Sequence, residues 1–147
     1  MLYRLIFIFC IAVLTTVNAS AQTPKSVLDA FSEKYPDVKN ATWNPGDKNT
    51  YEVDFESDDI AYTAVFSNDG KWVQTESSLE SDDLPPLVKE GVAKEFDGYL
   101  VTEAELVDSH DRGRLYSVHI ERGEETIVVL LDEDGKILSR ERDSDEG

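Results

Sequence analysis

Cysteine is nearly absent from this chain, because Cys10 is the only one in 147 residues. A single cysteine excludes an intramolecular disulfide framework and the multi-cysteine clusters of structural zinc sites. The fold must therefore be held by packing. A chain of this length buries roughly two thirds of its unfolded surface, which is enough for a core without covalent staples.

Positive charge is also scarce, with 14 Lys and Arg residues against 31 Asp and Glu residues and a formal net charge of −17. Such a field repels nucleic acid and anionic lipid, so neither is expected as a partner. An acidic surface suits a basic partner or cations. It equally serves to keep a soluble protein apart from its neighbours by like-charge repulsion.

The sequence lacks an apolar run long enough to cross a bilayer, since a helical span needs about 20 apolar residues. Its longest apolar stretch is the short run 5–14, which follows Arg4 and precedes the small residues 18–21. A basic start, a short apolar stretch and an A-x-A site are typical of a secretory signal peptide. We therefore predict a signal peptide over 1–21, cleaved after Ala21, and a periplasmic or secreted chain without a membrane span.

Catalytic and metal-binding signatures are missing as well. Ser109 and His110 lie in a polar loop, and no glycine-framed serine offers a nucleophile elbow. Asp108, His110 and Asp111 form a loose group of metal-ligand types, whereas the acidic turn 132–135 is explained by turn chemistry. We predict no catalytic residues, no bound metal and no cofactor, and hence a protein that is not an enzyme.

What the sequence does contain is an internal similarity between Tyr51–Trp72 and Tyr116–Ile137. At a constant offset, the apolar positions Tyr51, Val53 and Phe55 align with Tyr116, Val118 and Ile120. The turns Asn68–Lys71 and Glu133–Lys136 align at the same offset. This pattern predicts a duplicated unit of roughly 60 residues.

Each unit opens with a predicted helix. Thr23 and Pro24 are typical of an N-cap followed by a first helical residue, and Pro36 ends the helix. The apolar stripe of the first helix comprises Val27, Leu28, Phe31 and Tyr35, and that of the second comprises Leu87, Val88, Val92 and Phe96. Gly91 interrupts the second stripe and weakens the helix by about 1 kcal/mol relative to alanine.

Strands follow each helix, and residues 51–56 show the alternation of a half-buried strand with one wet face. The predicted strands are 38–43, 51–56, 61–66 and 71–78 in the first unit and 101–107, 115–121, 125–131 and 136–141 in the second. The predicted fold class is α+β, with two tandem α-β-β-β-β repeats forming an antiparallel sheet and the helices packed on one face. The expected domain is 22–141, divided into units 22–81 and 82–141 that share one core, with a polar tail at 142–147.

Several motifs in this order resemble a known family. They are a helix ending in Tyr35-Pro36, then Ala41-x-Trp43, Tyr62-x-x-x-Phe66 and Gly70-x-Trp72, and finally Leu84-Pro85 opening a second copy. Their succession resembles the PepSY-like family of secreted, mostly bacterial proteins described as beta-lactamase-inhibitor-like. The resemblance implies a helix-backed sheet with an open face and a role in binding or inhibiting other proteins. It implies no catalytic residues.

The outward face of the predicted sheet is the candidate binding surface. Its expected members are Glu52, Asp54, Glu56, Thr63, Val65, His119, Val128 and Leu130. We expect Val65 and Leu130 to occupy equivalent exposed positions on this mixed apolar and acidic face, which is suited to another secreted or envelope protein. Two alternatives stay open at this point: a small-ligand or cation site along the acidic stripe, and a homodimer formed through these faces.

Overall fold

The structure is a computed structural model that describes residues 23–143, so the predicted signal peptide lies outside the described residues. The first four strands follow one helix, and the last four follow another. These elements are α1 (Lys25–Lys34), β1 (Ala41–Pro45), β2 (Thr50–Ser57), β3 (Ile60–Ser67), β4 (Trp72–Leu79), α2 (Pro86–Glu95), β5 (Leu100–Ser109), β6 (Gly113–Arg122), β7 (Glu125–Asp132) and β8 (Ile137–Asp143). The predicted α+β class is confirmed, and β8 continues two residues beyond the predicted end of the last strand.

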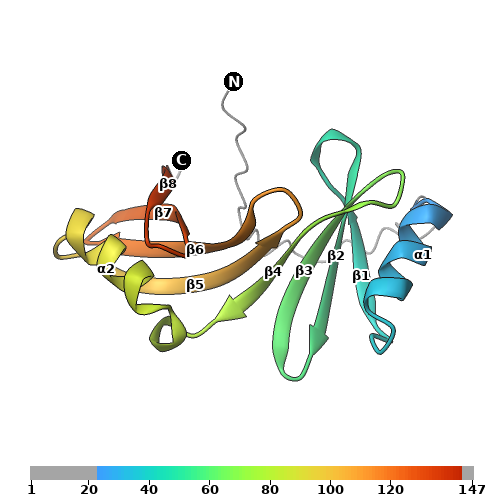
Figure 1. The fold of residues 1–147 in the computed structure, drawn as a ribbon, viewed down its shortest axis with the longest axis horizontal. Coiled ribbons are helices and arrows are strands. Elements are labelled where there is room, and N and C mark those ends of the chain that lie inside the picture. Colours follow the sequence, from blue (N-terminus) through green and yellow to red (C-terminus); the bar gives the residue numbers. More distant parts are fainter. Residues whose placement is uncertain (1–22, 144–147) are drawn as a thin grey trace.

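The eight strands form one antiparallel sheet in chain order, β1 to β8. The two halves meet where Gln74–Leu79 of β4 pairs with Ala104–Ser109 of β5. Figure 1 shows α1 and α2 at opposite ends of the molecule, each beside its own four strands. Because paired residues of antiparallel strands project to the same side, the strand register defines which side chains share the helix-covered face.

Helix α1 begins one residue later than its sequence predicts. Pro24, not Thr23, occupies the N-cap position, and no side chain caps the helix. The backbone N–H groups of Val27 and Leu28 donate to the Pro24 carbonyl at 3.0 and 3.2 Å. The Pro24 carbonyl thus accepts hydrogen bonds from two backbone N–H groups of the first turn, and these two groups need no capping hydroxyl.

Glycines allow the hairpin turns to lie directly against the helices. Gly70 and Gly135 both have positive φ, and a Cβ atom on them would lie 2.6 Å from the Ser26 carbonyl oxygen and 2.0 Å from the Leu87 carbonyl oxygen. A Cβ on Gly91 would lie 2.1 Å from the Gly135 carbonyl oxygen. Gly91 is therefore more than a weak helix residue, because the packing of α2 on the β7–β8 turn requires its missing side chain.

Two separate hydrophobic clusters lie under the two helices, so the expectation of one shared core is wrong. The first cluster contains Val27, Phe31, Val53, Phe55, Ala64 and Phe66. The second contains Leu84, Val88, Val92, Phe96, Ala104, Tyr116, Val118, Ile120, Ile127, Val129 and Leu131. Between them, the paired residues Thr75 and Asp108 form a polar seam on the helix-covered face. Thr75 is bonded there to Tyr35 and, at 2.8 Å, to the Trp72 indole nitrogen, which separates the apolar clusters.

No helix within residues 23–143 is long and apolar enough to cross a membrane.

Candidate functional site: the open face of the sheet

The face of the sheet opposite α1 and α2, here called the open face, carries all eight of the predicted binding residues. The register places them as Glu52 opposite Val65, Asp54 opposite Thr63, Glu56 opposite Ala61, His119 opposite Val128, and Leu130 opposite Ser117. They fall into two groups, one on β2 and β3 and the other on β6 and β7. The central strands β4 and β5 separate these groups, and the sequence-based prediction named no residue on them.

Buried residues fill this central region of the open face. We call Val65, Gln74, Glu76, Val107 and Leu115 the central strip, and each is less than 9% exposed. One row of the register runs from Thr63 through Glu76 and Val107 to Leu115, across four adjacent strands. The open face is therefore a continuous surface with a packed middle, not two isolated patches.

The expectation that Val65 is exposed is wrong, because only 6% of this residue is accessible. It is paired with Glu52 on β2 and with Gln74 on β4, both of which have long side chains. Leu130 lies between the short side chains of Ser117 and Ser139 and is half-buried. Alternation assigned both residues to the correct face, but their exposure depends on the neighbouring strands.

Glu76 is the most perturbed carboxyl group of the open face. It is 7% exposed, and its Oε1 accepts a hydrogen bond from Gln74 Nε2 at 2.8 Å. Burial, aided by the negative charges of Glu105 and Glu52, raises the pKa of Glu76 from 4.5 to about 8, against the opposing effect of the Gln74 bond. Glu76 is thus mainly protonated at neutral pH and becomes ionised in mildly basic solution.

Neighbouring carboxyl groups on the open face are shifted in the same direction. Burial raises the pKa of Glu105, with His119 opposing and Glu103 adding to the effect. Burial also raises the pKa of Glu52, with a further contribution from the Asp54 carboxylate. A carboxylate that is partly desolvated beside like charges is stabilised by an approaching cation, so this face favours cationic groups.

The open face contains a small cleft of about 80 Å³. Its lining combines three carboxyl groups and one guanidinium with uncharged polar and aliphatic side chains: Glu76, Glu105, Glu141, Arg112, Gln74, Ser117, Ser139, Val107, Val128 and Leu130. Pockets for drug-sized ligands are usually about 300–1,000 Å³, so this cleft suits one inserted side chain better than a whole metabolite.

The groups singled out as metal-ligand types have other partners. Asp108 Oδ1 accepts from Arg114 Nε at 3.3 Å, and the ring of His110 meets Trp72 edge-on at 6.2 Å. Asp132 Oδ1 accepts the backbone N–H groups of Asp134 and Lys136, which is turn chemistry. In the part of the chain that the structure describes, no group of three or more His, Cys, Asp or Glu residues is arranged to hold a metal ion.

A family model described as "Putative beta-lactamase-inhibitor-like, PepSY-like" matches residues 49–139, which is more than half of the chain. The chain belongs to the PepSY-like family. The match confirms the resemblance to this family, and it covers the motifs around Phe66, Trp72 and Leu84. It spans the last three strands of the first half, all of α2, and the second half into β8.

Solved structures from Bacteroides share the fold of this PepSY-like protein. A DUF2874 family protein of Bacteroides ovatus has a TM-score of 0.76 at 21% identity, covering 83% of this chain and 89% of that one. A "putative periplasmic" protein of Bacteroides eggerthii has a TM-score of 0.75 at 22% identity, with coverages of 82% and 88%. A BLIP-like protein of Bacteroides fragilis has a TM-score of 0.72 at 20% identity, with coverages of 89% and 96%. No curated protein matches the chain.

Proposed function

We propose that this PepSY-like protein is an exported, non-catalytic protein-binding module that holds a basic surface of another secreted or envelope protein against its open face. The observation that carries the proposal is the uncovered sheet face, with its packed central strip, half-buried aliphatic residues and surplus of carboxyl groups. The family description as beta-lactamase-inhibitor-like and the BLIP-like neighbour support a binding role of this kind. The neighbour named as periplasmic supports the exported location.

The dimensions of the open face suit a protein partner. Eight strands spaced about 4.8 Å apart span about 34 Å, and strands of about eight residues are about 26 Å long. The product is about 900 Å², which is close to the roughly 800 Å² that each partner contributes to a standard protein interface. A metabolite would occupy only a small fraction of this surface.

The apolar part of the proposed contact lies on β7. Val128 and Leu130 are both half-buried, and both border the small cleft. A partner side chain that enters the cleft would bury these two aliphatic residues and gain about 25 cal/mol for each Å² of apolar surface removed from water. Contacts that carry most of the binding energy cluster near the centre of an interface, in well-packed pockets from which water is excluded.

Charge would select the partner. Glu52, Asp54 and Glu56 lie on one strand of the open face, and Glu103 and Glu105 lie on another. Complementary charge accelerates encounter and fixes orientation, and salt weakens both effects. A lysine or arginine placed beside Glu76 would favour its ionised form, so we expect binding to release a proton.

Inhibition of a secreted enzyme is the specific form of binding that we propose. Covering an active site requires only a stable, complementary surface and no catalytic group on the inhibitor. Such an inhibitor acts by covering the active site of the enzyme and by dissociating slowly from it.

The experiment is capture of envelope proteins by the immobilised protein at low and high salt. Capture by the wild type is compared with capture by Leu130→Lys, on the open face, and by Leu87→Lys, a 50% exposed residue on α2. We expect a protein that is retained at low salt, released at high salt, lost with Leu130→Lys and kept with Leu87→Lys. Equal retention by the two variants would contradict binding through the open face.

A further inference from the structure

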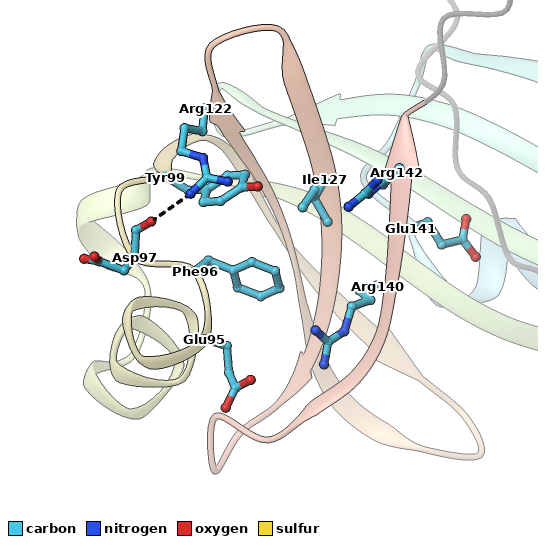
Figure 2. Close-up of a pocket in the computed structure, with 9 residues that line it drawn as sticks. All are labelled: Glu95, Phe96, Asp97, Tyr99, Arg122, Ile127, Arg140, Glu141 and Arg142. Atoms are coloured by element: carbon cyan, nitrogen blue, oxygen red, sulfur yellow. Dashed lines mark hydrogen bonds between the residues drawn. The ribbon is translucent and has the colours of Figure 1, made fainter.

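A second concave site lies on the opposite side of the sheet, at the C-terminal end of α2 (Figure 2). It is a cleft of about 600 Å³. Its floor is apolar and is formed by Phe96, Tyr99 and Ile127, and its outer wall is formed by β8. Arg140 of β8 pairs with the core residue Val129, which places this cleft on the helix-covered face and away from the open face.

Three arginines line this cleft in a chain with a net charge of −17. The guanidinium of Arg122 stacks 4.4 Å from the centre of the Tyr99 ring, and its Nη1 donates to the Asp97 carbonyl at 3.5 Å. The guanidinium of Arg140 lies 5.7 Å from the centre of the Phe96 ring. Arg142 is the third. Aromatic rings thus hold two of the three guanidinium groups, those of Arg122 and Arg140, over the apolar floor.

One acidic side chain beside the cleft, Glu125, engages two of the three arginines and leaves Arg140 aside. Glu125 accepts a hydrogen bond from the Tyr99 hydroxyl and forms ion pairs with Arg142 Nε at 3.2 Å and with Arg122 Nη2 at 3.8 Å. The carboxyl groups of Asp97 and Glu141 point out of the cleft in Figure 2.

Arg140 differs from the other two arginines because it makes no ion pair with any residue in the range 23–143. It extends from β8 toward Phe96, and the exposed Glu95 lines the same cleft (Figure 2). The cleft therefore presents, at the edge of an aromatic floor, a guanidinium that has an aromatic contact and no ion pair among the described residues. A guanidinium presents parallel N–H donors that match a planar carboxylate.

We infer that this cleft binds a small organic carboxylate with an aromatic body. The body packs on Phe96, Tyr99 and Ile127, and the carboxylate accepts hydrogen bonds from Arg140 at the β8 edge. The volume lies within the usual range of ligand pockets, and the lining combines three aromatic or aliphatic residues with six charged ones. This site is independent of the open face and of the proposed protein partner.

The test is isothermal titration calorimetry of the purified protein with 1-naphthoate and with its neutral isostere 1-naphthamide. We expect naphthoate to bind with a Kd below about 1 mM, a value that corresponds to a binding free energy of about −4.1 kcal/mol. The Kd of naphthamide should be at least about tenfold higher. Arg140→Gln should weaken naphthoate binding about tenfold while leaving the melting temperature unchanged. Arg114→Gln, which removes an arginine paired with Asp108 elsewhere, should leave the affinity unchanged.

Three results would overturn the inference: no naphthoate binding at millimolar concentration, equal affinity for the two compounds, or equal effects of the two arginine variants. A second measurement locates the bound compound independently of affinity. In amide chemical-shift mapping we expect naphthoate to perturb Tyr99 and Ile127 and to leave the open-face residue Glu76 unaffected. Perturbations confined to the open face would contradict the assignment of this cleft.

Discussion

Replacing Glu76 by glutamine tests the electrostatics of the open face, because it removes a buried carboxyl group and keeps the size of the side chain. The folded-state pKa of Glu76, about 8, lies above its ordinary value of 4.5. Between these two pH values the folded protein holds a proton that the unfolded chain has released. Stability from this group is therefore fully present below about pH 4.5 and is lost as the pH rises through about 8.

The magnitude follows from the interval between the two pKa values. An interval of about 3.5, at 1.36 kcal/mol for each pH unit, corresponds to a loss of at most about 5 kcal/mol between pH 4.5 and 8. Such a loss is a large part of the 5–15 kcal/mol that typically stabilises a domain. The Glu76→Gln variant has no titrating group at position 76, so its free energy of unfolding should not show this loss between about pH 4.5 and 8.

The assay is denaturant unfolding of the wild type, of Glu76→Gln and of the control Glu56→Gln, at constant ionic strength from about pH 4 to pH 9. Glu56 is an exposed carboxylate near the end of the same face, so its replacement should leave the pH profile of the wild type intact. We expect Glu76→Gln to match the wild type near pH 4 and to exceed it by several kcal/mol near pH 9. Parallel profiles for the wild type and Glu76→Gln would refute the proposed burial and protonation of Glu76.

Three further predictions concern packing, exposure and binding. Gly91→Ala should destabilise the protein by about 1–3 kcal/mol in thermal unfolding, because the added Cβ meets a hairpin carbonyl oxygen. The control Ala93→Gly, at an exposed position of the same helix, should cost about 1 kcal/mol through helix propensity. A Gly91→Ala variant that is more stable than the wild type would show that the turn does not pack against α2 as described. Leu130→Lys should lower the free energy of unfolding by about 1 kcal/mol or less, whereas Val65→Asp should lower it by about 3 kcal/mol or more, because it buries a carboxylate beside other acids. Similar melting curves for the two variants would contradict the different burial of Val65 and Leu130. Capture of a basic partner should strengthen as the pH rises through about 8 in the wild type and not in Glu76→Gln, and identical pH profiles of capture would exclude Glu76 from the contact.

Local patterns in the sequence predicted the elements and the face of each residue. Alternation in 51–56 placed Val53 and Phe55 toward the helix, and the Asn68-Asp69-Gly70 turn correctly paired Phe66 with Trp72. These features depend on neighbours along the chain, so periodicity and turn chemistry are enough to predict them. The sequence duplication stays a prediction.

Burial across strands was not predictable in the same way. Gln74 and Glu76 are polar residues on alternate positions, a pattern typical of a wet face, whereas their burial depends on the flanking strands β3 and β5, of which β5 belongs to the other half of the chain. The cleft at α2 brings Phe96 together with Arg122 and Arg140, which no local motif connects. Arg142 was assigned to a polar tail, although it extends β8 and forms an ion pair with Glu125.

The central claim is that the open face contacts a protein partner, and site-specific photocrosslinking tests it most directly. A photoreactive phenylalanine analogue replaces Leu130 on the open face or, in the matched control, Leu87 on α2, and each protein is irradiated with envelope extract at low salt. We predict a crosslinked species from position 130 that disappears at high salt, and no such species from position 87. Crosslinking from position 87 alone, or a salt-resistant product of equal yield from both positions, would contradict the account.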